Sequence, residues 1–177
     1  MTDAVTALKD DFKLFLQALW EELDLPSPTR AQYSIADYLQ HGPKRLQIQA
    51  FRGVGKSWIT GAFVLWTLFK DPEKKIMIIS ASKERADNMS IFLQKLIIET
   101  SWLKHLRPKS EDSRWSRISF DVLCSPHQAP SVKSVGIPGV MYKGYGKDPA
   151  VRELLKKLKK DAADSLDSSG MGTRWKV

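Results

Sequence analysis

The residues best suited to chemistry lie together in the segment 50–57, AFRGVGKS. Its two glycines allow a loop to turn successive backbone N–H groups toward one point, where they can bind an anion such as a phosphate. Lys56 would reach the β- and γ-phosphates of a nucleotide, and Ser57 would place its hydroxyl on Mg²⁺. The segment therefore predicts an ATP and Mg²⁺ site built from Gly53, Val54, Gly55, Lys56 and Ser57.

One position departs from the Walker A pattern G-x-x-x-x-G-K-[ST], because Ala50 stands where the pattern has its first glycine. Alanine is the mildest replacement where this position keeps ordinary φ and ψ angles. The alternative is a strand–turn–helix corner that contains Gly-Lys-Ser by chance. The flanking residues favour the nucleotide interpretation, since 46–51 alternates like a strand and the apolar run 58–69 has helical spacing, which predicts a helix over 56–69.

Two further side chains could complete this site. Arg52 lies in the loop and could stabilise charge on the γ-phosphoryl group as an arginine supplied in cis, which makes Arg52 and Lys56 the catalytic candidates. Gln32, in the order Pro-Thr-x-x-Gln, carries an amide that can both donate to and accept from adenine, so it could select the base. The alternatives are a solvated loop arginine and an exposed helical glutamine.

A second strand and helix are expected to lie beside the loop. The apolar run 75–81, KIMIISA, indicates a strand buried on both faces of a parallel sheet, and a helix over 83–99 follows it. Ligands lie at the C-terminal ends of the strands in such sheets. Lys83 and Arg85 would then face the loop side and could contact nucleic-acid phosphate, although a solvated first helical turn explains them equally well.

The remaining elements complete an α/β fold, a parallel sheet flanked by helices. The apolar spacing predicts one amphipathic helix over 3–23, and a helix over 29–40 follows a proline-rich connector. A short helix over 102–106 precedes two alternating runs, 117–123 and 131–137, which we expect to be neighbouring strands.

The composition changes near residue 140, where we place a domain boundary. Residues 1–140 form the predicted nucleotide-binding domain. Within 141–177, Asp148 and Pro149 begin a basic amphipathic helix, and the polar stretch from 164 onward is predicted to be disordered.

The overall charge bounds the partners. The formal net charge is +8 at pH 7, which favours an acidic partner, most simply nucleic acid. A single cysteine excludes an intramolecular disulfide and fits a reducing cytosol. The chain shows neither a signal-peptide pattern nor an apolar run of membrane-spanning length, so we expect a cytoplasmic protein without a membrane partner.

Several stretches together resemble a known family. LPSPTRAQ, QAFRGVGKS, IMIISASKERADNMSIF, ISFDV and SVKSVGI, all within 8–137, resemble the N-terminal ATPase part of phage large terminases, the DNA maturase B of podovirus-type coliphages. The resemblance implies a RecA-like P-loop fold with an additional strand, and ATP as fuel. It also implies double-stranded DNA as substrate, a portal protein and a small terminase subunit as partners, a ring of copies, and the host-cell cytoplasm. Residue by residue, it makes Gln32 the adenine contact, Arg52 the cis-acting arginine, and Lys56 and Ser57 the phosphate and Mg²⁺ ligands.

The family pattern also includes an acidic motif that this chain lacks. No run of four apolar residues after Ser57 is followed by an acidic pair, and Asp121 is a lone carboxylate on an alternating run. The carboxylate cluster of the terminase nuclease is not found either. The sequence thus predicts a P-loop ATPase fold that is incomplete on its C-terminal side, as in a truncated terminase.

Two functions follow from this pattern. The first is the ATP-binding part of a DNA-packaging terminase, which drives DNA translocation in the intact protein. The alternative is a non-catalytic nucleotide- or DNA-binding module that regulates or interferes with an intact terminase. A helicase or kinase of the P-loop class is a weaker match, because no helicase acidic motif or kinase lid is present in the sequence.

Overall fold

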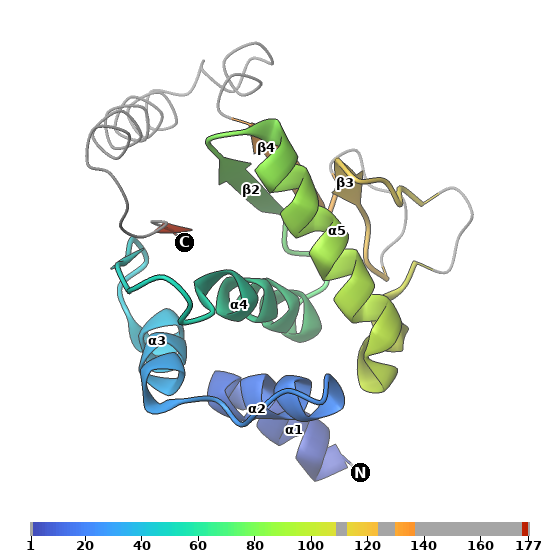
Figure 1. Ribbon diagram of the computed structural model, residues 1–177. Coiled ribbons are helices and arrows are strands. Elements are labelled where there is room, and N and C mark those ends of the chain that lie inside the picture. Colours follow the sequence, from blue (N-terminus) through green and yellow to red (C-terminus); the bar gives the residue numbers. More distant parts are fainter. Residues whose placement is uncertain (1, 109–112, 124–129, 137–174, 177) are drawn as a thin grey trace, which may run out of the picture.

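The computed structural model describes residues 2–108, 113–123, 130–136 and 175–176. Figure 1 shows how the helices and strands are arranged. In chain order the elements are α1 (Thr2–Asp10), α2 (Phe12–Glu22), α3 (Arg30–His41), β1 (Gln47–Ile48), α4 (Lys56–Lys70), β2 (Ile76–Ser80), α5 (Lys83–Glu99), the 3₁₀ helix η1 (Ser101–Leu106), β3 (Ser119–Phe120), β4 (Val132–Gly136) and β5 (Trp175–Lys176). No helix among the described residues is both long and apolar enough to cross a membrane.

Helix α4 forms the centre of the core. It contacts α1, α2, α3, α5 and η1, and its apolar residues are buried around most of its circumference. At Gly61 the packing against α5 is so close that a Cβ atom would lie 2.7 Å from Cε1 of Phe92. A glycine in a helix interior destabilises the helix by roughly 0.5–1 kcal/mol relative to alanine. The presence of Gly61 here indicates that the close packing of α4 against α5 stabilises the fold by more than this amount. The fully buried side chains of this core include Phe12, Phe15, Leu16, Leu19, Ile59, Leu65, Leu68, Leu93, Leu96, Ile97, Leu103 and Phe120.

The three-stranded sheet is mixed rather than parallel throughout. Strand β4 lies in the middle, with β2 parallel to it on one side and β3 antiparallel on the other. Helix α5 lies across this sheet (Figure 1) and contacts all three strands. The predicted α/β class and the neighbouring positions of runs 117–123 and 131–137 are confirmed, whereas the parallel arrangement holds only for β2 and β4.

The strand next to the candidate loop differs from the prediction. The expected strand 46–51 is reduced to β1, which pairs antiparallel with β5 and not with the three-stranded sheet. β1 covers only Gln47–Ile48, and the segment that leads to α4 follows it. Residues 175–176 belong to the segment predicted to be disordered, and for these two residues that prediction was wrong.

Two other strand predictions need correction. The run 117–123 forms a ladder only over β3, with a single further bridge between Trp115 and Phe120. Strand β2 was expected to be buried on both faces, but Met77 is 41% exposed. Within the described residues β2 pairs only with β4, so it is an edge strand of this sheet.

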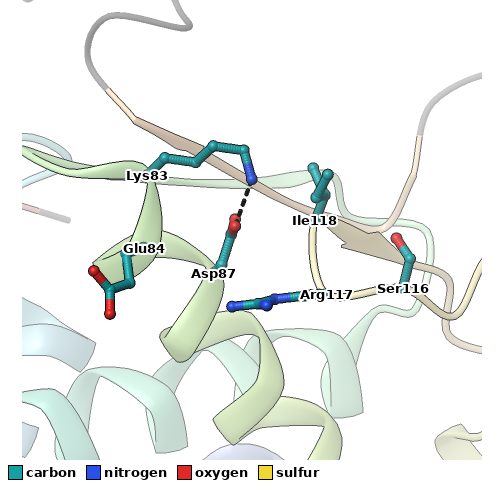
Figure 2. A pocket seen from close by; sticks show the side chains of 6 residues that line it. All are labelled: Lys83, Glu84, Asp87, Ser116, Arg117 and Ile118. Atoms are coloured by element: carbon teal, nitrogen blue, oxygen red, sulfur yellow. Dashed lines mark hydrogen bonds and ion pairs between the residues drawn. The ribbon is translucent and has the colours of Figure 1, made fainter.

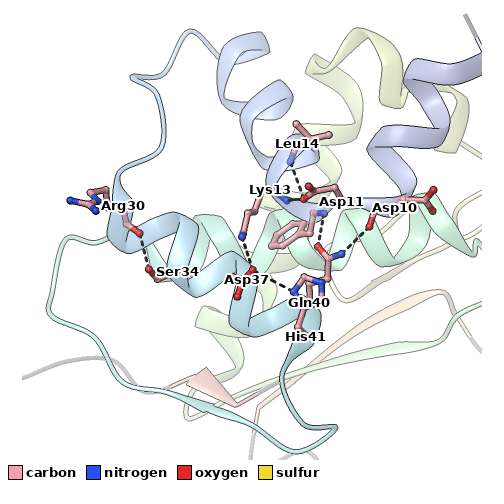
Figure 3. Close-up of polar contacts among 10 residues, drawn as sticks. Asp10, Asp11, Lys13, Leu14, Arg30, Ser34, Asp37, Gln40 and His41 are labelled. Atoms are coloured by element: carbon pink, nitrogen blue, oxygen red, sulfur yellow. Dashed lines mark hydrogen bonds and ion pairs between the residues drawn. The ribbon is translucent and has the colours of Figure 1, made fainter.

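The helix predicted over 3–23 is two helices, because Asp11 interrupts it. Asp11 has extended backbone angles and caps α2, its carboxylate accepting hydrogen bonds from the backbone N–H groups of Lys13 and Leu14. Gln40 of α3 bridges the break, accepting from Phe12 N and donating to the carbonyl oxygen of Asp10 (Figure 3). The apolar spacing continues across the break, so the periodicity alone could not reveal it.

The other helices agree closely with the predictions. The ranges 29–40, 56–69 and 83–99 correspond to α3, α4 and α5 to within one residue at each end, and 102–106 corresponds to η1. The predicted boundary at residue 140, the basic helix from Asp148 and the segment 164–174 lie outside the described residues.

Replacing Asp11 should destabilise the fold. Asp11→Ala removes the α2 cap and is expected to lower the free energy of unfolding by about 1 kcal/mol, measured by denaturant unfolding. The matched control is Asp10→Ala, because the exposed Asp10 joins the same junction through its backbone carbonyl. Equal losses in both variants would contradict the capping role of Asp11.

Candidate phosphate-binding site

The segment between β1 and α4 turns sharply at two glycines. Gly53 has φ 93° and Gly55 has φ 83°, both in the left-handed region that a residue with a side chain rarely adopts. Gly55 is also the N-cap of α4, and no side chain caps this helix. The first N–H groups of α4 are therefore not bound by a capping side chain. An anion site at a helix N-terminus requires N–H groups that are open in this way.

The Lys56 side chain folds back onto the loop. Its Nζ donates hydrogen bonds to the carbonyl oxygens of Ala50 at 2.6 Å and Phe51 at 2.7 Å. Lys56 is only 6% exposed, and this burial lowers the pKa of its ammonium group below the ordinary value. The structure thus holds a buried positive charge inside the loop, solvated by backbone carbonyls.

Gln32 lies against the other half of the loop. Its Nε2 donates to the carbonyl oxygen of Val54 at 3.1 Å, while its Oε1 accepts from Thr29 N at 2.7 Å. The fold therefore brings Gln32 beside the loop although 22 residues separate it from Val54. Arg52 and Ser57 are both exposed, Arg52 in the loop and Ser57 in the first turn of α4.

These residues fit a phosphate group. The backbone around the two left-handed glycines and the uncapped start of α4 offer N–H donors, and the Lys56 ammonium adds positive charge. The space beside Gly53 is open, since a Cβ there would meet no atom within 4 Å. For Mg²⁺, the predicted protein ligand is the Ser57 hydroxyl. The described residues contain no group of three or more His, Cys, Asp or Glu side chains that could hold a metal ion. A metal here would be held through Ser57 and the phosphates of the nucleotide.

Asp121 has a different role, in holding the sheet region together. It is 3% exposed and accepts hydrogen bonds from Arg114 N, Arg114 Nε and Ser131 N. Burial alone would raise the pKa of this carboxyl group, but the hydrogen bonds and charge of Arg114 bring it below its ordinary value. Both oxygens of Asp121 are therefore engaged with Arg114 and Ser131.

A second polar group lies at the start of α5, beside a cavity of about 460 Å³ (Figure 2). Asp87 is buried, accepting from Lys83 through one oxygen and from the Ser134 hydroxyl through the other. Burial would raise the pKa of Asp87, but Lys83 and Ser134 hold it below its ordinary value. Lys83, predicted to contact phosphate, is thus already paired with a carboxylate, while Arg85 is exposed.

Sequence reasoning did not single out Asp87 or the carbonyl groups that hold the loop. The spacing of Lys83 and Asp87, four residues apart on a helix, was a signal for their ion pair. The carbonyls of Ala50, Phe51 and Val54 have no such signal, because every residue carries the same backbone group.

Comparison with known proteins supports the resemblance seen in the sequence. The terminase large subunit of Enterobacteria phage T3 is 53% identical to this chain over 137 residues. This chain is a relative of part of a terminase large subunit. The match covers 76% of the chain but only 23% of its terminase relative, so the chain spans about a quarter of that protein's length. No protein-family model matches the chain.

The engaged state of Asp121 predicts an acid-sensitive contribution to stability. Since its folded pKa is depressed, the ionised group stabilises the fold above its unfolded pKa of about 3.9, and this stabilisation is lost as pH falls through the folded pKa. Asp121→Asn should lower the free energy of unfolding at pH 7 by about 1–3 kcal/mol. It should also reduce the loss of stability below about pH 4.

The measurement is denaturant unfolding between pH 7 and pH 2, with the exposed Asp10→Asn as the control. A variant whose stability falls with acid as steeply as that of the wild type would show that Asp121 does not carry this effect.

Proposed function

We propose that this chain is the ATP-binding part of a viral DNA-packaging terminase large subunit, with a P-loop at residues 50–57. The observation that carries the proposal is the Lys56 ammonium, buried inside a glycine turn that leads directly into α4. The 53% identity with a terminase large subunit supports the same assignment.

Each residue of the loop has a distinct task in this proposal. The N–H groups around Gly53 and Gly55, with the N-terminus of α4, hold the phosphates. Lys56 leaves the carbonyls of Ala50 and Phe51 and moves onto phosphate oxygens. Arg52 reaches the γ-phosphoryl group and Ser57 is a ligand of Mg²⁺. Bound Mg²⁺ would neutralise charge on the β- and γ-phosphates.

The wider process follows from the terminase relationship. In the intact protein, ATP turnover would drive double-stranded DNA into a capsid in the host-cell cytoplasm. The partners would be a portal protein, a small terminase subunit and further copies in a ring. The isolated chain is expected to bind ATP with little turnover, because the sequence has no acidic pair after a run of four apolar residues and Asp121 is engaged with Arg114 and Ser131.

ATP binding should depend on Lys56. Lys56→Ala is expected to weaken binding of ATPγS with Mg²⁺ at least tenfold, since the phosphates lose their buried cation. Isothermal titration calorimetry measures the affinity, beside a phosphate-release assay with ATP. Lys70→Ala is the matched control, because Lys70 lies at the far end of the same helix over the Trp66 ring. Unchanged affinity in Lys56→Ala would place the nucleotide elsewhere.

The second candidate function is a non-catalytic module that binds nucleotide or DNA and regulates or interferes with an intact terminase. The engaged Asp121 and the net charge of +8 favour it. Phosphate release above background by the isolated chain would argue against this candidate and for the first.

DNA binding should show the salt dependence of backbone contacts. Both candidates predict that the affinity for double-stranded DNA falls steeply between 50 and 200 mM salt, because bound cations release counterions. Arg85→Ala should reduce the slope of log affinity against log salt by about one, while Lys95→Ala, an exposed lysine paired with Glu99 on the same helix, should change it less. Fluorescence anisotropy with a labelled duplex measures both. Identical slopes for Arg85→Ala and wild type would exclude Arg85 from the DNA contact.

A further inference from the structure

We propose that Gln32 is a positioning residue that sets the shape of the phosphate loop by holding the carbonyl oxygen of Val54. This inference rests on the proposed function, because it concerns how the same loop binds phosphate.

The chemistry of the Gln32 amide fixes its orientation from both ends. Thr29 N–H can only donate, so the atom that faces it is Oε1, and the Val54 carbonyl can only accept, so the atom that faces it is Nε2. These two bonds use one of the two Nε2 hydrogens and one of the two Oε1 lone pairs. They make the amide a bridge between the start of α3 and the loop.

The helix that carries Gln32 is itself held firmly. Thr29 and Gln32 form a capping box at the start of α3, with the Thr29 hydroxyl accepting from Gln32 N. At the other end of α3, Gln40 binds both sides of the α1–α2 junction, and Asp37 pairs with Lys13 (Figure 3). The Gln32 amide thus extends from a fixed support to a loop that otherwise turns at two flexible glycines.

The contact with Val54 orients a donor for phosphate. The Val54 carbonyl and the Gly55 N–H belong to one planar trans peptide unit, so they point in opposite directions. Holding the carbonyl on Gln32 therefore turns the Gly55 N–H away from α3. Val54 is 5% exposed, and a Cβ at Gly55 would lie 3.1 Å from Gln32 Nε2, so the amide packs directly against this peptide.

A ligand without a base separates the two roles of Gln32. Inorganic tripolyphosphate, ATP and GTP share a triphosphate chain, but tripolyphosphate has no base to read. If Gln32 positions the loop, Gln32→Ala should weaken all three by the same factor, about three- to tenfold, as expected for the loss of one hydrogen bond. If Gln32 selects adenine, ATP alone should weaken.

Two further variants isolate the bond to Val54. Gln32→Glu keeps the oxygen that faces Thr29 N but replaces the Nε2 donor by a second oxygen that faces the Val54 carbonyl. It should therefore lower the affinity for all three ligands at least as much as Gln32→Ala does. Thr29→Ala weakens the same helix cap but leaves both amide contacts of Gln32 available, so it should change each affinity less than twofold.

Calorimetric titration of the wild type and the three variants with each ligand tests the proposal. Gln32→Ala that loses affinity for ATP but not for tripolyphosphate would overturn the proposal. So would Gln32→Ala that binds all three ligands as tightly as the wild type. A Thr29→Ala variant that loses as much affinity as Gln32→Ala would overturn it as well. Wild-type protein that binds none of the three ligands would instead refute the proposed nucleotide function.

If the wild-type protein binds none of the three ligands, amide hydrogen exchange in the ligand-free protein still tests whether Gln32 positions the loop. Gln32→Ala should speed exchange across 53–55 relative to both wild type and Thr29→Ala, because the Val54–Gly55 peptide loses its anchor. Exchange at 53–55 that is equal in all three proteins would show that Gln32 does not shape the loop.

Discussion

The burial of α4 is the constraint on which the rest of the structure depends. The helix contacts four other α-helices and η1, so its apolar surface is removed from water in several directions. Each fully buried Leu, Ile or Phe side chain contributes roughly 1.5–3 kcal/mol relative to exposure, and α4 supplies Ile59, Leu65 and Leu68. Since the candidate loop ends at the first residue of α4, the core determines where the loop lies.

The loop contains an unusual balance of charge and burial. An ammonium group that is removed from water is costly unless other groups solvate it, and at Lys56 two backbone carbonyls do so. Carbonyls are neutral dipoles, so a phosphate that offers full negative charge would be a stronger partner for the same group. In the proposed function, the two carbonyls would satisfy Lys56 until a phosphate replaced them.

The sequence predicted the helices well because each has a long apolar face whose period matches 3.6 residues per turn. It predicted the strands less well, since β1 and β3 are two residues long and their pairing depends on distant segments. The break at Asp11 was invisible because the apolar period runs through it, although aspartate is a good N-cap.

For the candidate site, the sequence pattern predicted the loop, Lys56 and Gln32, and their roles in binding a nucleotide stay predictions. It could not show that Gln32 binds the carbonyl of Val54, because a backbone acceptor has no residue identity. The engagement of Asp121 by Arg114 and Ser131 likewise depends on how β3 and β4 pair, which the spacing alone does not specify.

The close approach of Gly61 to Phe92 has a consequence for how this protein can tolerate insertions and deletions. Gly61, where α4 packs tightly against α5, lies six positions after Gly55, the second glycine of the loop. When one residue is added to or removed from a helix, the segment before it rotates by about 100° about the helix axis and shifts by about 1.5 Å along it. A single inserted residue between these glycines would therefore turn the loop to another side of the helix while the core stayed in place. Changes in length should accumulate in the turn 71–75 after α4, and be rare between the two glycines.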